Sequence, residues 1–248
     1  MSSPFAIVTG TSSGIGAVLT RRLLDEGWTV LGVSRRRADF AGAYSHLVVD
    51  LADVDEAARR LEPALAERLP HPWSRIGLVN NAAFGGRLGP LEHVGASELG
   101  RVHAVNVVVP SWLMGVMIRL TPASTPLRIV NVSSGAAVQA IPGLGPYCSS
   151  KAALRMAGQV LGAELASPLR RTPAPRDTAI LSYEPGVVET PMQRGARETS
   201  AEEFSWVGLF LDFKARGIVV SPDLPATEIL AFLASGPGPT FSERRRGE

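Results

Sequence analysis

Near its start the chain reads Thr9-Gly10-Thr11-Ser12-Ser13-Gly14-Ile15-Gly16, between an apolar run and a segment of helical period. Residues 5–9 form a candidate strand, and the apolar positions from Ile15 to Leu23 share one face of a candidate helix that ends at Gly27. Glycines let the backbone approach a pyrophosphate, and the unpaired amides at a helix start attract its charge. The stretch therefore predicts a dinucleotide-binding turn.

Short β-branched runs alternate with longer helical segments along the rest of the chain, as in parallel sheets joined by crossover helices. Further candidate strands cover residues 28–33, 46–49, 76–79, 127–132 and 178–183, and a last helix covers residues 224–234. We predict an α/β fold, a Rossmann-type doubly wound parallel sheet flanked by helices, in one domain spanning residues 1–248.

Residues 190–217 break this alternation by mixing charges with aromatic side chains such as Phe204, Trp206 and Phe210. The segment suits a small lobe over the site, and an ordinary core-packing insertion fits it equally well.

Polar side chains stand where several candidate strands end. Asp50, Asn80-Asn81 and Ser133-Ser134 each follow an apolar run. Because the carboxyl ends of parallel strands line the ligand crevice, we expect a binding edge there.

The second candidate strand ends in Ser34-Arg35-Arg36-Arg37, where an NAD enzyme would present an acidic residue to the ribose. Guanidinium groups instead attract the additional phosphate of NADP and bind it with paired hydrogen bonds. The pattern indicates NADP(H), with a solvated basic turn as the alternative.

A tyrosine and a lysine one helical turn apart, Tyr147 and Lys151, predict an acid–base group. An ammonium beside a phenol is expected to lower the phenol pKa, and Ser134 is placed to hold a substrate carbonyl. Such pairs also occur on helices for structural reasons alone.

The glycine-rich stretch also matches G-x-S-x-G, with Ser12 as a nucleophile, so a hydrolase has to be considered. That class needs a histidine late in the chain, whereas the four histidines are His46, His71, His93 and His103. We reject the hydrolase on this order.

The composition of the chain bears on its partners and its cellular compartment. The 248 residues are 45% apolar and 19% charged with a net charge of +2, so we expect no nucleic-acid partner. The lone Cys148 favours a reducing cytoplasm, no apolar stretch suggests a membrane span, and Arg244 to Arg246 are interpreted as a solvated tail.

Together these motifs resemble the short-chain dehydrogenase/reductase family over nearly the whole chain. Residues 9–16 match its TGxxxGxG, Asn80-Asn81-Ala82 its NNAG, and Tyr147 with Lys151 its YxxxK; Ser134 stands 13 residues before the tyrosine. Ala83 replaces the usual glycine, which a negative φ accommodates. The resemblance implies cofactor contacts by Gly10, Ser12, Ser13, Gly14, Ile15, Gly16, Arg35, Arg36, Asp50, Leu51, Asn81, Ala82, Tyr147, Lys151, Pro185, Gly186, Val188 and Thr190.

The same resemblance implies a metal-free hydride transfer in which Tyr147 is the acid and Ser134 holds the substrate carbonyl. It also implies that Lys151 lowers the pKa of Tyr147 and binds the ribose of the cofactor. Asn106 matches the family's helix asparagine, which supports a relay water. Within the family the chain is similar to the benzil reductase and sepiapterin reductase branch, which implies a ketone or diketone substrate.

Three further implications concern class and assembly. A homodimer or homotetramer is expected by analogy with the family. A non-catalytic dinucleotide sensor on the same fold is the main alternative, although it has no need of Ser134, Tyr147 and Lys151 together. An epimerase or dehydratase fits less well, because such enzymes usually resemble longer chains.

Overall fold

The computed structural model describes residues 2–248 around one seven-stranded sheet in the order β3-β2-β1-β4-β5-β6-β7, with every neighbouring pair parallel. The doubly wound fold class is confirmed. The strands are β1 Phe5–Thr9, β2 Thr29–Ser34, β3 Tyr44–Val48, β4 Ile76–Asn80, β5 Leu127–Val132, β6 Thr178–Glu184 and β7 Phe241–Arg245.

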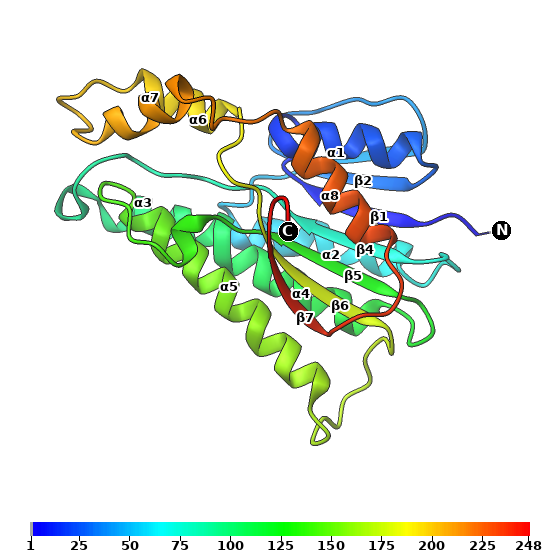
Figure 1. Cartoon of the computed structure of the whole chain (residues 1–248). Coiled ribbons are helices and arrows are strands. Elements are labelled where there is room, and N and C mark those ends of the chain that lie inside the picture. Colours follow the sequence, from blue (N-terminus) through cyan, green and yellow to red (C-terminus); the bar gives the residue numbers. More distant parts are fainter. Residues whose placement is uncertain (1) are drawn as a thin grey trace.

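Helices cover both faces of this sheet (Figure 1). One face packs against α1 and α8, and the other against α2, α4 and α5. The α-helices are α1 Gly14–Asp25, α2 Val54–Arg68, α3 Ala96–His103, α4 Val109–Leu120, α5 Gly145–Ala166, α6 Pro191–Glu198, α7 Val207–Ala215 and α8 Asp223–Ala234. Shorter turns are η1 Leu91–His93, the π-helical η2 Ala104–Val108 and η3 Gly135–Ala137.

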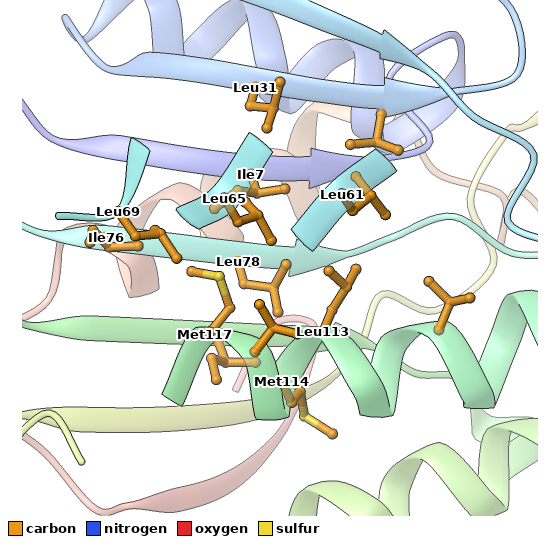
Figure 2. Close-up of a cluster of buried hydrophobic side chains, with 14 of the residues drawn as sticks. Ile7, Leu31, Leu61, Leu65, Leu69, Ile76, Leu78, Leu113, Met114 and Met117 are labelled. Atoms are coloured by element: carbon orange, nitrogen blue, oxygen red, sulfur yellow. The ribbon is translucent and has the colours of Figure 1, made fainter. Parts of the chain in front are cut away.

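The larger apolar cluster lies between the sheet and helices α2 and α4 (Figure 2). Leu61 and Leu65 of α2 lie near Ile7 of β1, and Leu113 of α4 lies over β4, the next strand of the sheet. These side chains are fully buried, because the strands are apolar on both faces and each helix presents one apolar stripe. The result is a rigid platform beneath the strand ends.

The strand order reverses between β1 and β4, since β2 and β3 lie on one side of β1 and β4 to β7 on the other. Such a reversal opens a crevice at the carboxyl ends of the two central strands. The glycine-rich turn follows β1 and Asn81 follows β4, so both border this crevice.

One continuous helical stretch, Ala96–Leu120, is long and apolar enough to cross a membrane, with a window of mean hydropathy 1.3. Of that window 61% is buried inside the protein. Val109, Leu113 and Met117 pack into the core described above, so the apolar character serves that core.

The basic run near the chain end is not simply a solvated tail, as the sequence suggested. Arg244 and Arg245 belong to β7, which pairs in parallel with β6, and Arg246 continues into a turn against Pro185. Their side chains are largely exposed because β7 is an edge strand, which explains why the run looks like a tail.

Helices α6 and α7 lie apart from the sheet, beyond the carboxyl ends of its strands (Figure 1). They fall inside residues 190–217, the segment that broke the alternation in the sequence. Phe204 and Phe210 are buried in a separate small apolar cluster there.

Candidate active site

The turn after β1 holds two glycines with positive φ, Gly10 at 76° and Gly14 at 57°. A Cβ at Gly16 would collide with the Gly10 carbonyl oxygen and lie 2.5 Å from Asn81 Nδ2. The three glycines are therefore required by the tight path of the turn.

The start of α1 is open to an anion. Ser13 is the N-cap, and its side chain makes no capping hydrogen bond. Ser12 and Ser13 are half-buried, whereas the Ile15 side chain is buried in the core and leaves only its backbone at the turn. This cradle of uncapped amides without β-carbons fits the pyrophosphate of a dinucleotide.

Two neighbouring segments close around the turn. Asn81 Nδ2 donates to Thr9 O at 2.8 Å, and the Asn81 and Ala82 amides both donate to Thr9 Oγ1 at 3.0 Å. On the other side a Cβ at Gly14 would lie 3.2 Å from Thr190 Cγ2. The structure thus brings the ends of β1, β4 and β6 together.

Thr190 follows a turn that contains a glycine with positive φ. Gly186 has φ 74°, Val188 forms a parallel bridge with Val220, and Thr190 Oγ1 caps α6 by accepting from Gln193 N. Arg246 Nε donates to Pro185 O at 3.1 Å, a contact that sequence reasoning missed because a basic run near a chain end carries no signal for it.

The Arg35-Arg36-Arg37 turn stands at the end of β2. All three side chains are exposed, and Arg37 pairs with Asp39 at 3.0 Å. Within residues 2–248 neither Arg35 nor Arg36 makes an ion pair, so both guanidinium groups are available to an anion. Asp50 lies after β3, where its Oδ1 accepts from Ala52 N at 3.0 Å beside the buried Leu51.

Tyr147 and Lys151 occupy one face of the first turns of α5. Lys151 Nζ lies 5.5 Å from the centroid of the Tyr147 ring and donates to Val132 O of β5 at 2.7 Å. Ser134 follows the same strand, and its Oγ accepts from Ala136 N at 3.2 Å. The structure therefore gathers the predicted Ser-Tyr-Lys set at the carboxyl edge of β5.

The electrostatics of this set differ from the sequence-based expectation. Burial raises the pKa of Tyr147 to about 12, opposed by the Ser134 hydroxyl, which lowers it. Burial also lowers the pKa of Lys151 to about 8. Because the ammonium is itself desolvated and donates to Val132 O, loss of hydration dominates and the phenol stays protonated at neutral pH.

Asn106 lies in the π-helical turn η2. Its Oδ1 accepts from Phe84 N at 2.8 Å, and its Nδ2 donates to Phe84 O and to Ser150 Oγ, both at 2.9 Å. The side chain joins the segment after β4 to α5. Pro110 has no N–H, so the Asn106 carbonyl lacks its usual α-helical donor four residues on.

Apolar side chains surround the phenol on the side of α6 and α7. Tyr147 packs against the cluster that contains Leu144 and Phe204. The space beside the phenol is therefore bounded by hydrocarbon on this side.

Comparisons with known proteins find similar chains and folds. The family model described as short chain dehydrogenase matches residues 4–201. Benzil reductase ((S)-benzoin forming) of Bacillus cereus is 30% identical over 235 residues, covering 91% of this chain and 92% of that protein. Sepiapterin reductase of Bos taurus is 30% identical over 247 residues, covering 92% and 88%. A short chain dehydrogenase/reductase crystal structure from Saccharomyces cerevisiae superposes with a TM-score of 0.83 at 23% identity, covering 99% and 97%.

Proposed function

The chain belongs to the short-chain dehydrogenase/reductase family, and from that membership we propose that it is an NADPH-dependent carbonyl reductase acting on ketones or vicinal diketones. The observation that carries the proposal is the meeting of Ser134, Tyr147 and Lys151 at the carboxyl edge of β5. The benzil and sepiapterin reductases named above support a carbonyl substrate, and the apolar surroundings of the phenol suit an aromatic one.

The end of β2 supports NADP(H) over NAD(H). Arg35 and Arg36 are exposed, and within residues 2–248 neither is paired with a carboxylate. A 2′-phosphate would supply the missing anion, with paired hydrogen bonds from a guanidinium. Binding of the remaining dinucleotide is assigned to the glycine-rich turn, Asp50 and Leu51, Asn81 and Ala82, and the segment from Pro185 to Thr190.

The cofactor, when bound, supplies the hydride that forms the new C–H bond at the carbonyl carbon. Tyr147 donates its phenolic proton to the carbonyl oxygen as the C=O π pair moves onto that oxygen. Ser134 accepts from Ala136 and keeps its own O–H as a donor to the same oxygen. Lys151 stabilises the resulting phenolate, since a pKa of about 8 leaves most of its side chains charged at pH 7.

Asn106 contributes to this proton transfer by holding a water molecule. Its amide side chain is fully engaged by Phe84 and Ser150, so we assign the relay water to its backbone carbonyl, which Pro110 leaves without an α-helical donor. Such a water would return a proton to the phenolate after each turnover.

The proposal is tested by loss of NADPH absorbance over a panel of carbonyl compounds headed by aromatic diketones. Tyr147→Phe is expected to lower kcat at least a hundredfold, because the acid is lost, while the NADPH dissociation constant stays within about threefold. Tyr183→Phe is the control, since Tyr183 hydrogen-bonds Glu228 in the core. Wild-type turnover by Tyr147→Phe would reject the acid, a preference for NADH would reject the arginines, and no turnover of any carbonyl would favour a dinucleotide sensor.

We further propose that the enzyme is cytoplasmic, because the lone Cys148 forms no internal disulfide, and that it assembles as a homodimer or homotetramer. A groove of about 380 Å³ between α4 and α5 is lined mainly by apolar side chains such as Met114, Met156 and Val160, together with Ser111 and Glu164. A second copy of the chain presenting the same face would cover it. The lobe of α6 and α7 is assigned to substrate contact.

A further inference from the structure

Four polar side chains form a continuous chain between the glycine-rich turn and the arginine turn after β2. Thr11 Oγ1 lies 3.4 Å from Tyr44 Oη, and Tyr44 Oη lies 2.6 Å from His46 Nδ1. His46 Nε2 lies 3.4 Å from Ser34 Oγ, which donates to Arg36 O at 2.7 Å.

The backbone of β2 is shaped to admit these side chains. Gly32 pairs in register with His46, and a Cβ at Gly32 would collide with the Tyr44 hydroxyl. Phe40 packs edge-on against the Tyr44 ring with centroids 5.0 Å apart, and the Arg21 guanidinium lies over Phe40. The phenol is thus fixed over the sheet by packing as well as by hydrogen bonds.

Only one arrangement of hydrogens satisfies every contact with a neutral imidazole. Ser34 donates its only O–H to Arg36 O, so Ser34 Oγ must accept from His46 Nε2–H. His46 Nδ1 then accepts, which makes Tyr44 the donor and leaves Thr11 to donate to the Tyr44 oxygen. All donors point in the same direction, from residue 11 toward residue 36.

The titration of the two rings agrees with this arrangement. Burial raises the pKa of Tyr44, which keeps the phenol protonated as a donor. Burial also lowers the pKa of His46, and Arg37 lowers it further against the opposing effects of Ser34 and Asp39. A neutral imidazole and an intact phenol are therefore the resting forms at neutral pH.

We propose that His46 is a positioning residue for recognition of the 2′-phosphate, acting through Ser34 and the backbone of Arg36. The inference rests on the proposed binding of NADP(H). By holding Arg36 O through Ser34, the imidazole fixes the turn that presents the exposed Arg35 and Arg36 side chains. Through Tyr44 and Thr11 it ties that turn to the residue next to Gly10, so the two phosphate sites keep a fixed separation.

Without the imidazole, Ser34 Oγ loses the donor that orients it toward Arg36 O, so more of the ordering of the arginine turn falls to phosphate binding. Ordering a long side chain on binding costs enough to lower affinity by up to about tenfold. The cost falls on ligands that carry a 2′-phosphate, because Arg35 and Arg36 have no other assigned contact. Adenosine 2′,5′-bisphosphate and 5′-AMP differ only in that group, so the ratio of their dissociation constants isolates the effect.

The experiment measures both dissociation constants by calorimetry at pH 7.5 for wild type, His46→Phe, His46→Gln and Tyr44→Phe. His93→Phe is the matched control, because His93 is exposed on η1. We expect wild type and His93→Phe to prefer the bisphosphate, and His46→Phe to lose about tenfold of that preference with 5′-AMP unchanged. His46→Gln, which keeps an amide donor for Ser34, should retain most of it, and Tyr44→Phe should lose part.

An unchanged ratio in His46→Phe, with wild type preferring the bisphosphate, would overturn the role of His46 and leave the NADP proposal intact. Equal weakening of both probes together with a lower Tm would also overturn it, because the residue would then serve stability alone. If His46→Phe does not fold, Tyr44→Phe decides: loss of part of the preference supports the role of His46, and an unchanged ratio overturns it. No preference in wild type would reject NADP recognition itself, and the inference with it.

Discussion

The buried ammonium of Lys151 gives the free enzyme a defined dependence of stability on pH. Its pKa is about 8 when folded, against an ordinary value of 10.5, because burial disfavours the charged form. Between pH 8 and 10.5 the unfolded chain therefore holds more protons at this site than the folded chain. The contribution of Lys151 to the free energy of unfolding rises with pH across that window, by at most about 1.4 kcal/mol per pH unit.

Lys151→Met removes this group and is the comparison that tests it. Urea unfolding of both proteins without ligand at pH 7, 8, 9 and 10 should show wild type gaining stability relative to the variant above pH 8. Titrations common to both proteins cancel in the difference. A difference that stays flat from pH 8 to 10 would show that the ammonium is not desolvated as the structure places it.

Gly16 is the residue of the glycine-rich turn with the least room. A methyl group there would strike the Gly10 carbonyl and lie 2.5 Å from Asn81 Nδ2, so backbone would have to move. Gly16→Ala is expected to cost about 1–3 kcal/mol in unfolding free energy and to weaken NADPH binding at least tenfold. Gly115→Ala is the control, because a Cβ at this helical position meets nothing within 4 Å and should be neutral or slightly stabilising. Equal behaviour of the two variants in urea unfolding would contradict the close approach.

At the level of single residues, the residues of the candidate site could be picked out from their types and spacing. Their burial and their hydrogen-bond partners could not. Ala83 has negative φ, as its place in the motif required, since no residue other than glycine has positive φ within residues 2–248. The direction of the Tyr147 pKa shift was wrong, because sequence shows the neighbouring lysine but not the burial of both groups. His46 gave no signal, since its partner Ser34 comes from another strand.

At the level of elements, α6 and α7 are joined to the rest of the site by one carboxylate. Glu189 lies 2.8 Å from Arg197, 3.3 Å from Arg194 and 3.1 Å from Lys214. Arg197 most of all, and Lys214 after it, hold the pKa of Glu189 below its usual range. Glu189→Ala should increase amide hydrogen exchange across residues 191–215, because both helices lose their shared partner. The thermodynamic loss is expected to be small, since the pairs are partly exposed.

Glu198→Ala is the matched control for this exchange measurement. Glu198 is the exposed last residue of α6 and makes no ion pair within the part of the chain that the structure describes, residues 2–248. Identical exchange in Glu189→Ala and wild type would mean that the apolar cluster around Phe204 and Phe210 alone orders the two helices.

The elements that sequence predicted best are those with apolar period and clear ends. β1 and β5 match their expected bounds, because each is an uninterrupted apolar run next to a turn signal. β7 was missed because three of its five residues are charged and it lies at an edge where they face solvent. The π-helical turn at Asn106 was missed for another reason, since no residue pattern specifies where a helix widens.

At the level of the whole molecule, the doubly wound parallel sheet was predicted as a class, but the order of its seven individual strands was not. Alternating strands and helices imply right-handed crossovers, whereas the reversal between β1 and β4 is decided by which helix covers which face. The crevice exists only because of that reversal. The residues at the strand ends and their common edge could therefore be predicted from sequence, but the contacts between them, such as Asn81 with Thr9, required the fold.

Assembly is the property of the whole molecule with the clearest test. On the outer face of α5, Met156 is 55% exposed and Val160 48% exposed beside the groove toward α4. Covering them with a second copy would remove apolar surface from water twice, because both subunits present the same face. A glutamate placed there would be buried without a partner, at a cost of several kcal/mol.

Val160→Glu should therefore convert the oligomer to monomers in light scattering coupled to size-exclusion chromatography, with the Tm measured in parallel. Leu169→Glu is the control, since Leu169 is 77% exposed beyond the end of α5 and away from the groove. A monomeric wild type at every concentration would reject the proposed assembly. An oligomer that survives Val160→Glu would keep the assembly and move its interface elsewhere, because a carboxylate in place of Val160, one helical turn from Glu164, would add a second like charge to the covered face of each subunit.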